Sequence, residues 1–215
     1  YNKKRSDMDM CGRYYIDAED QAVQTLIAEI AAGPDGVRML DMKLGEIFPT
    51  NTVPALVAEG GRLMRWGFSR YNGGGAVINA RSETAMVKPM FAKSMQERRC
   101  LLPASRYFEW QRTPGGAKKQ KYAIALPGGK PFYLAGVYRQ EKQFPVPVFA
   151  ILTREAAPEL AYLHERMPVA LPYSARDAWL SPTCNVEETM QSCLTSFICT
   201  PAAENKAAQI GFDLN

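Results

Sequence analysis

A cysteine next to a candidate start residue is the most chemically suggestive feature of the chain. Cys11 follows Met10, and removal of everything before it would leave a thiol and an α-amine on adjacent carbons. An α-amine with a pKa near ~7.7–8.0 is substantially neutral at physiological pH and can condense with an aldehyde to give a Schiff base. Attack of the thiolate on the same carbon would then close a thiazolidine ring. The plainer alternative is a cysteine that lies near a start site without a chemical role.

Two further residues could move protons. Glu109 stands between Phe108 and Trp110 in a predicted strand, where partial desolvation would raise its pKa toward the range of an acid–base catalyst. A solvent-facing position on an edge strand is the alternative for this carboxylate. His164 is the single histidine of the chain, and Arg166 two residues later would suit an anion such as a phosphate. A hydrogen-bonded packing residue is the alternative for this imidazole.

Two short runs have the residue types that contact nucleic acids. Asn79 and Arg81 precede a predicted helix start. Their side chains can hold a phosphate there, and the exposed main-chain N–H groups of the helix start also favour an anion. Capping of that helix by Ser82 is the alternative. Trp66 and Gly67 stand at the end of a predicted strand, and stacking of a base on an aromatic ring contributes ~1–3 kcal/mol. Core packing is the more frequent use of such a strand end.

The elements that must position these residues follow from hydrophobic periodicity and turn residues. A helix is predicted over 19–32, with Asp17 as its cap. A second helical stretch, capped by Ser82 and interrupted by Pro89, is predicted to run to about Met95. The predicted strands are 53–58 and 63–68, which form a hairpin, then 76–79, 105–112, 121–126, 132–139 and 146–153, and shorter helices are predicted over 158–164 and 173–180. Evenly spaced strands of this kind favour an antiparallel sheet that curls or closes. The predicted fold class is a single α+β domain with a barrel-like core and flanking helices.

Composition narrows the class of protein. The 215 residues are 47% hydrophobic and 22% charged, which is typical of a globular chain, and the net charge of +4 permits an anionic partner without requiring one. No apolar run approaches the ~18 residues of a membrane span, and no secretory signal is present. Five cysteines without a C-x-x-C pair argue against a zinc site, so we expect no metal and no cofactor. We interpret residues 1–9 as an extraneous leader or tag, and residues 10–215 as the domain of an intracellular, cytoplasmic protein.

The motifs occur in an order that resembles the SOS response-associated peptidase (SRAP) family, whose members shield abasic sites in single-stranded DNA. The resemblance extends from Met10 to about Leu180. It rests on Met10-Cys11-Gly12-Arg13-Tyr14, Pro49-Thr50-Asn51, Trp66-Gly67, Asn79-Ala80-Arg81-Ser82-Glu83-Thr84, Arg99-Cys100-Leu101-Leu102-Pro103-Ala104, Tyr107-Phe108-Glu109-Trp110, Ile151-Leu152-Thr153-Arg154-Glu155-Ala156 and His164-Glu165-Arg166-Met167-Pro168-Val169.

The resemblance implies a role for each candidate residue. Cys11 matches a nucleophile that forms a thiazolidine with the ring-opened sugar of an abasic site, and Asn79 matches the amide that positions cysteine and sugar. Glu109 matches the acid/base that shuttles protons, and His164 matches a residue beside the opened sugar. The implied partner is single-stranded DNA that contains abasic sites, bound by a nucleoid-associated monomer with no membrane partner. The implied DNA contacts are Arg13, Trp66, Gly67, Arg81, Trp110 and Arg166.

Three functions remain open from the sequence. The first is a cross-linker of abasic sites, which needs both the amine and the thiol of Cys11. The second is a cysteine peptidase of the N-terminal-nucleophile type, acting on itself or on other peptides, which needs the thiol and a base. The third is a non-covalent single-strand-binding module, which needs neither group.

Overall fold

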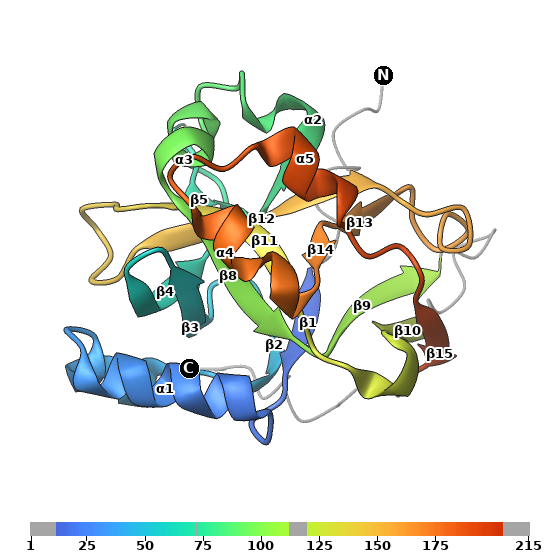
Figure 1. Ribbon diagram of the computed structural model, residues 1–215, viewed down its shortest axis with the longest axis horizontal. Helices are drawn as coiled ribbons and strands as arrows, with labels where there is room; N and C mark the ends of the chain where they lie inside the picture. The colour runs from blue at the N-terminus through green and yellow to red at the C-terminus, as the bar shows by residue number, and fades with distance from the viewer. Residues whose placement is uncertain (1–11, 72, 112–119, 204–215) are drawn as a thin grey trace, which may run out of the picture.

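Two sheets form most of the protein. The computed structural model describes residues 12–71, 73–111 and 120–203 (Figure 1). The strands are β1 (Arg13–Ile16), β2 (Gly45–Ile47), β3 (Thr52–Val57), β4 (Gly60–Trp66), β5 (Phe68–Ser69), β6 (Ala76–Val77), β7 (Asn79–Arg81), β8 (Arg99–Ala104), β9 (Arg106–Gln111), β10 (Gln120–Ala125), β11 (Phe132–Arg139), β12 (Val148–Glu155), β13 (Arg166–Pro168), β14 (Ala170–Leu171) and β15 (Ile198–Pro201). The helices are α1 (Gln21–Ala32), α2 (Ser82–Ala85), α3 (Ala92–Glu97), α4 (Arg176–Leu180) and α5 (Val186–Gln191), with 3-10 turns over Gly36–Asp41, Pro127–Gly129 and Tyr173–Ala175.

Strand β12 closes the larger sheet into a ring. It pairs antiparallel with β11 and parallel with β4, and the order β12-β4-β3-β8-β11 returns to β12. Strands β7 and β13 also attach to β12, and β14 attaches to β11. The smaller sheet has the order β15-β10-β9-β1-β2 and is antiparallel. The predicted α+β fold with a barrel-like core is confirmed, and the parallel pairings of β12 with β4 and β7 are additions to it.

Strands β3, β8, β11 and β12 of the ring bury both of their faces. Side chains alternate between the two faces of a strand, so neighbouring residues enter different apolar clusters. One cluster includes Tyr14 and Ile47 of the smaller sheet, and the other includes Leu26, Phe91 and Trp179 from the helical segments. This double burial explains why these four strands are nearly continuous apolar runs in the sequence.

Helix α1 lies along one side of the molecule, against β3 and β4 (Figure 1). Gly61 of β4 makes this close approach possible, because a Cβ atom there would lie 2.8 Å from side-chain atoms of both Leu26 and Ile30. Asp20 caps the helix by accepting hydrogen bonds from the N–H groups of Ala22 and Val23. Asp17 was the predicted cap, and that prediction was wrong by one helical turn.

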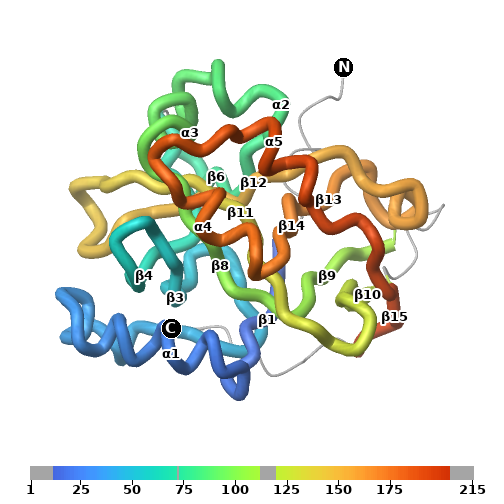
Figure 2. The backbone as a smooth tube through the Cα atoms, in the orientation of Figure 1, coloured from blue at the N-terminus to red at the C-terminus, as the bar shows by residue number. Residues whose placement is uncertain are grey.

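Three local predictions differ from the structure. Residues 158–163 form turns where a helix over 158–164 was predicted. Ser82 is the first residue of α2 rather than its cap, and Arg81 precedes the helix without a side-chain capping bond. The sequence pattern predicted no element after Leu180, yet α5 and β15 follow, and Figure 2 traces this segment to the edge of the smaller sheet beside β10. In the part of the chain that the structure describes, no helix is long and apolar enough to cross a membrane.

Candidate active site

Glu109 lies in a central strand of the smaller sheet. β9 pairs with β1 on one side and with β10 on the other, and Glu109 stands opposite Tyr122 with 3% of its surface exposed. This burial confirms the predicted desolvation, and the alternative of a solvent-facing edge position is wrong. Arg13 of β1 stands opposite Phe108, so continuation of the antiparallel register leads Gly12 toward Glu109.

Asn79 and His164 belong to segments that flank β12. Asn79 begins β7 and stands opposite Ile151 of β12. His164 is 8% exposed and precedes β13 by two residues. Thr153 of β12 stands opposite Arg81 on one side and is paired with β13 on the other. Asn79 therefore lies beside the middle of β12, and the segment that contains His164 lies beside its C-terminal end, where Glu155 stands opposite Arg166.

A chain of contacts connects β1 to the strand of Asn79. The ring of Tyr14 packs edge-on against Trp66 with 5.3 Å between centroids. The Nε1–H of Trp66 donates to the carbonyl of Ile78 at 2.9 Å, and Ile78 directly precedes Asn79. β1 also pairs with β9, the strand of Glu109. β1 is therefore in contact with the strand of Glu109 in the smaller sheet and, through Trp66, with the segment of Asn79 in the larger sheet.

The predicted nucleophile Cys11 lies outside the described residues, as do residues 1–10. The four cysteines that the structure describes are free thiols. Burial raises the pKa of the Cys100 thiol well above its ordinary value, which makes it a poor nucleophile. Within the described ranges, no group of three His, Cys, Asp or Glu side chains could hold a metal ion.

A groove with a volume of about 870 Å³ is lined by Asn79 and Arg81 of β7. Arg70 and Lys88 add two further cations to its wall, and Tyr71, which is 81% exposed, adds an aromatic ring. The described residues that line the groove include no acidic side chain. A concave surface with cations and an exposed ring is suited to the phosphates and unstacked bases of a single strand.

Thr50 lines the same groove in a strained conformation. Its φ of 74° lies in the left-handed region, which β-branched residues rarely adopt and which costs about 1–3 kcal/mol. The Thr50 N–H donates to the carbonyl of Trp66 at 2.9 Å, and the Arg65 guanidinium donates to the Thr50 carbonyl. The neighbouring strand therefore holds this residue in place at the groove wall.

Trp66 and Gly67, two of the predicted DNA contacts, are buried and do not reach the surface. Trp66 is completely buried and stacks on Phe149 with 6.1 Å between ring centroids, so it cannot stack on a base. Gly67 is also buried, with a φ of 120° and its N–H donated to the carbonyl of Phe149. The expected contacts of Trp66 and Gly67 with DNA were wrong, and core packing is the correct alternative.

Arg13 belongs to a partly buried cluster of charges and aromatic rings. Its guanidinium lies 4.5 Å from the centre of the Phe48 ring and 4.8 Å from that of Trp110, and it donates to Glu46 at 3.3 Å. Glu46 also accepts from the buried Lys121 ammonium at 2.6 Å. Arg13 retains 34% exposure of its side chain, so DNA contacts by Arg13 and Trp110 stay predictions.

Arg166 is engaged by protein groups. Its guanidinium donates to the two carboxylate oxygens of Glu83 at 2.7 and 2.8 Å, and to the carbonyl of Thr153 at 2.7 Å. These hydrogen bonds from Arg166 hold the pKa of Glu83 below its ordinary value. The side chain of Arg166 is 11% exposed, which favours a structural link over the expected contact with a phosphate.

Arg70, Tyr71 and Lys88 line the groove but were not predicted as site residues. Arg70 and Tyr71 precede the glycine triplet 73–75, and Lys88 precedes Pro89, so all three lie in connecting segments. Hydrophobic periodicity carries no information about such segments. The composition of the 70–75 loop, with a cation and an aromatic residue beside glycines, is the one signal that could have identified it.

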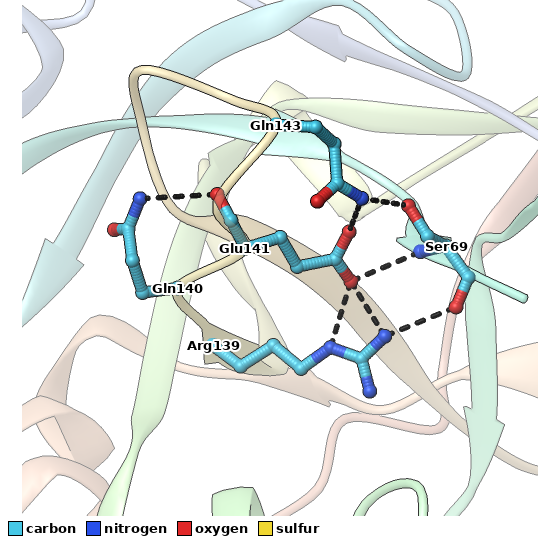
Figure 3. Close-up of polar contacts among 5 residues, drawn as sticks. All are labelled: Ser69, Arg139, Gln140, Glu141 and Gln143. Carbon is cyan, nitrogen blue, oxygen red and sulfur yellow. Dashed lines mark hydrogen bonds and ion pairs between the residues drawn. The ribbon is translucent and has the colours of Figure 1, made fainter. Parts of the chain in front are cut away.

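A buried ion pair anchors the segment that leads into this loop (Figure 3). Glu141 accepts from the Arg139 guanidinium at 2.7 Å, from the Ser69 N–H at 3.0 Å and from Gln143 at 2.8 Å. Arg139 also donates to the Ser69 carbonyl at 3.0 Å and lies 4.3 Å from the centre of the Phe68 ring. Burial raises the pKa of Glu141, but the hydrogen bonds from Ser69 and Arg139 outweigh it and the net pKa is lowered.

Glu141→Gln is expected to lower the free energy of unfolding by about 3 kcal/mol, because removal of one partner leaves the Arg139 charge uncompensated in a largely buried position. Urea denaturation measures this change. Glu59→Gln is the matched control, since Glu59 is exposed in the turn between β3 and β4. Equal stability of the two variants would show that the ion pair does not anchor the segment.

The sequence of the chain is similar to those of a known protein family. The family model for SOS response associated peptidase (SRAP) matches residues 10–210. The abasic site processing protein YoaM of Bacillus subtilis is 29% identical over 163 residues, which cover 70% of this chain and 71% of that protein. The abasic site processing protein YMR114C of Saccharomyces cerevisiae is 32% identical over 132 residues, covering 55% of this chain and 34% of the yeast protein. The chain therefore spans about a third of the yeast relative.

Two crystal structures share the fold. A protein from Bacteroides thetaiotaomicron superposes with a TM-score of 0.72 at 19% identity, over 90% of this chain and 92% of that one. A phage-related protein from Bordetella bronchiseptica superposes with a TM-score of 0.68 at 23% identity, over 90% of this chain and 95% of that one. At these identities, the comparison establishes the fold of the chain.

Proposed function

Because the chain belongs to the SOS response associated peptidase family, we propose that it processes abasic sites in single-stranded DNA. The relatives named as abasic site processing proteins support the abasic site as the target. The observation that carries the proposal is the groove, in which Asn79 lies beside three cations. The proposed product is a covalent thiazolidine cross-link through Cys11, formed when Cys11 is the first residue.

The proposed chemistry starts with the sugar. An abasic deoxyribose exposes its aldehyde only in a minor ring-opened form, so a proton donor to the ring oxygen speeds the first step. The α-amine of Cys11 then condenses with the aldehyde and releases water. Addition of the Cys11 thiol across the resulting C=N bond, with the proton moving to nitrogen, closes the ring. Glu109 is the proposed proton shuttle, since it is a buried carboxylate beside the register position of Gly12.

Asn79 and His164 are proposed to position the reacting groups. Asn79 lines the groove, where its side-chain amide can donate to the sugar or to the thiol while its carbonyl accepts from the amine. His164 is buried in the segment that leads into β13, and it is proposed to hydrogen-bond an oxygen of the opened sugar. The direct test is incubation of a chain that begins at Cys11 with abasic and undamaged oligonucleotides, followed by a denaturing gel. A retarded band with the abasic strand alone is expected.

Self-processing is a second candidate activity, favoured by the word peptidase in the family description. Cleavage before Cys11 would create the free amine that the cross-link requires. Intact-mass measurement of the purified chain over time tests it. Loss of residues 1–10 in the parent but not in Cys11→Ser supports self-processing, and retention of these residues in both contradicts it.

Binding to undamaged single strands is expected to be weak and salt-dependent. About 3–5 phosphate contacts predict a slope of log affinity against log salt between about −2 and −4. Fluorescence anisotropy of a labelled oligonucleotide over a salt series measures this slope. Arg81→Gln should reduce its magnitude by about 0.7, since Arg81 lines the groove.

Lys130→Gln is the control for this measurement, because Lys130 is exposed in the turn after β10 and does not line the groove. It should leave the slope within error of the parent value. A slope near zero in the parent, or equal slopes for the Arg81 variant and the parent, would contradict binding of the strand in this groove.

A further inference from the structure

The hydrogen bonds of His164 Nδ1 determine which nitrogen of the imidazole carries the proton. The main-chain N–H of Arg166 donates to Nδ1 at 3.0 Å, and the Arg166 carbonyl lies farther from Nδ1, at 3.3 Å. A main-chain N–H can only donate, so Nδ1 must be the acceptor in the shorter contact. A neutral imidazole with an accepting Nδ1 carries its proton on Nε2.

Arg166 is itself held from two other segments. Its planar guanidinium forms a bidentate pair with Glu83 of α2, and it donates to the main-chain carbonyl of Thr153 in β12. Bidentate pairing fixes the direction of an Arg side chain as well as its distance. Glu83 lies four residues after Asn79, so the ion pair ties the segment of Asn79 to the segment of His164 across β12.

We propose that Arg166 and Glu83 are positioning residues for His164: the Arg166 N–H holds the imidazole as the Nε2–H tautomer, and Glu83 holds Arg166. The effect of this tautomer on cross-link formation rests on the proposed function, whereas the tautomer itself can be observed without DNA. A neutral His164 of this form donates a hydrogen bond from Nε2 to an oxygen atom. It cannot accept a proton at Nδ1 without losing the bond from Arg166, so proton acceptance falls to Glu109.

Nitrogen-15 NMR of the whole chain tests the tautomer. The sequence contains one histidine, so every imidazole signal belongs to His164. At about pH 8.5, well above the ordinary histidine pKa of ~6.5, two-bond proton–nitrogen correlations distinguish the protonated nitrogen from the unprotonated one. We expect Nδ1 to be unprotonated and Nε2 to carry the proton. Protonation of Nδ1 in the parent would overturn the assignment.

Two variants test the positioning role. Glu83→Gln removes the charge from a side chain that is 50% exposed, so the fold should persist, and Arg166→Lys removes the bidentate geometry. Each should shift the His164 signals toward a mixture of tautomers. Each should also slow cross-link formation at saturating DNA by about 10- to 100-fold, while the dissociation constant for the strand changes little.

Glu165→Gln is the matched control, because Glu165 lies between His164 and Arg166 and is exposed. It should leave both the tautomer and the rate unchanged. Parent-like signals and rates in Glu83→Gln would overturn the positioning role. If the parent shows the Nε2–H tautomer but forms no adduct with abasic DNA, the proposed function fails while the assignment of the tautomer stands.

Discussion

A chain that begins at Cys11 should form a DNA adduct that survives denaturation, whereas the 215-residue chain with residues 1–10 in place should form none. The thiazolidine needs a free α-amine on the carbon next to that of the thiol. In the longer chain this nitrogen is part of a peptide bond and cannot condense with an aldehyde. A denaturing gel with an abasic single-stranded oligonucleotide measures the fraction of protein that is retarded. We expect a retarded band with the chain that begins at Cys11 and no retarded band with the 215-residue chain.

Two cysteine variants complete this test. Cys11→Ser keeps the amine but replaces the thiol, so the retarded band should be lost. Cys199→Ser is the control, since Cys199 lies in β15 at the edge of the smaller sheet and should not affect the adduct. A full yield of stable adduct from the 215-residue chain, with residues 1–10 shown to be in place by mass measurement, would rule out the thiazolidine.

Glu109→Gln should slow both formation and release of the adduct by about 10²- to 10⁴-fold, the range that positioned acid–base groups contribute. Glutamine keeps the shape of the buried side chain but can neither give nor take a proton. Single-turnover time courses on abasic DNA measure formation, and a chase with a competing aldehyde trap measures release. His164→Ala should mainly slow one direction and leave some adduct, because His164 is proposed to act by hydrogen bonding.

Glu159→Gln is the control for the acid–base prediction, because Glu159 is an exposed carboxylate in the turns before His164. It should form and release adduct at the rates of the parent. If Glu109→Gln does the same, then Glu109 has no acid–base role, and its burial in β9 serves the packing of the smaller sheet.

The elements that depend on local sequence were well predicted. The hairpin at Gly60 and the strands that became β9, β10, β11 and β12 were predicted within a few residues, because alternating apolar residues and glycine turns act over short distances. The predicted helix over 158–164 was wrong, since Pro158 and the buried Leu160 and Leu163 are equally compatible with turns that pack on the core. The spacing of apolar residues over so short a segment does not distinguish a helix from a series of turns.

The candidate site was predicted in part. The desolvation of Glu109 followed from its aromatic neighbours and is confirmed by its burial. The groove was not predictable, because Arg70 and Lys88 reach it from connecting segments that tertiary structure alone brings together. Trp66 was assigned to DNA from its motif, although the closed ring places it in the core. The pairing of Glu83 with Arg166 joins residues too far apart in the chain for any local pattern to indicate.

The closure of the ring by β12 also determines the stage of synthesis at which the proposed site can form. β12 begins at Val148, after most of the chain, and its partners β4 and β7 are made long before it. Pairings between such distant segments form late and slowly, because a long loop must be ordered first. A nascent chain that ends before β12 has neither the closed ring nor the strand that supports Asn79 and the His164 segment. Until synthesis has passed β12 and β13, Asn79 and the His164 segment therefore lack the strand against which they are held, and the proposed site can form only in the last third of synthesis.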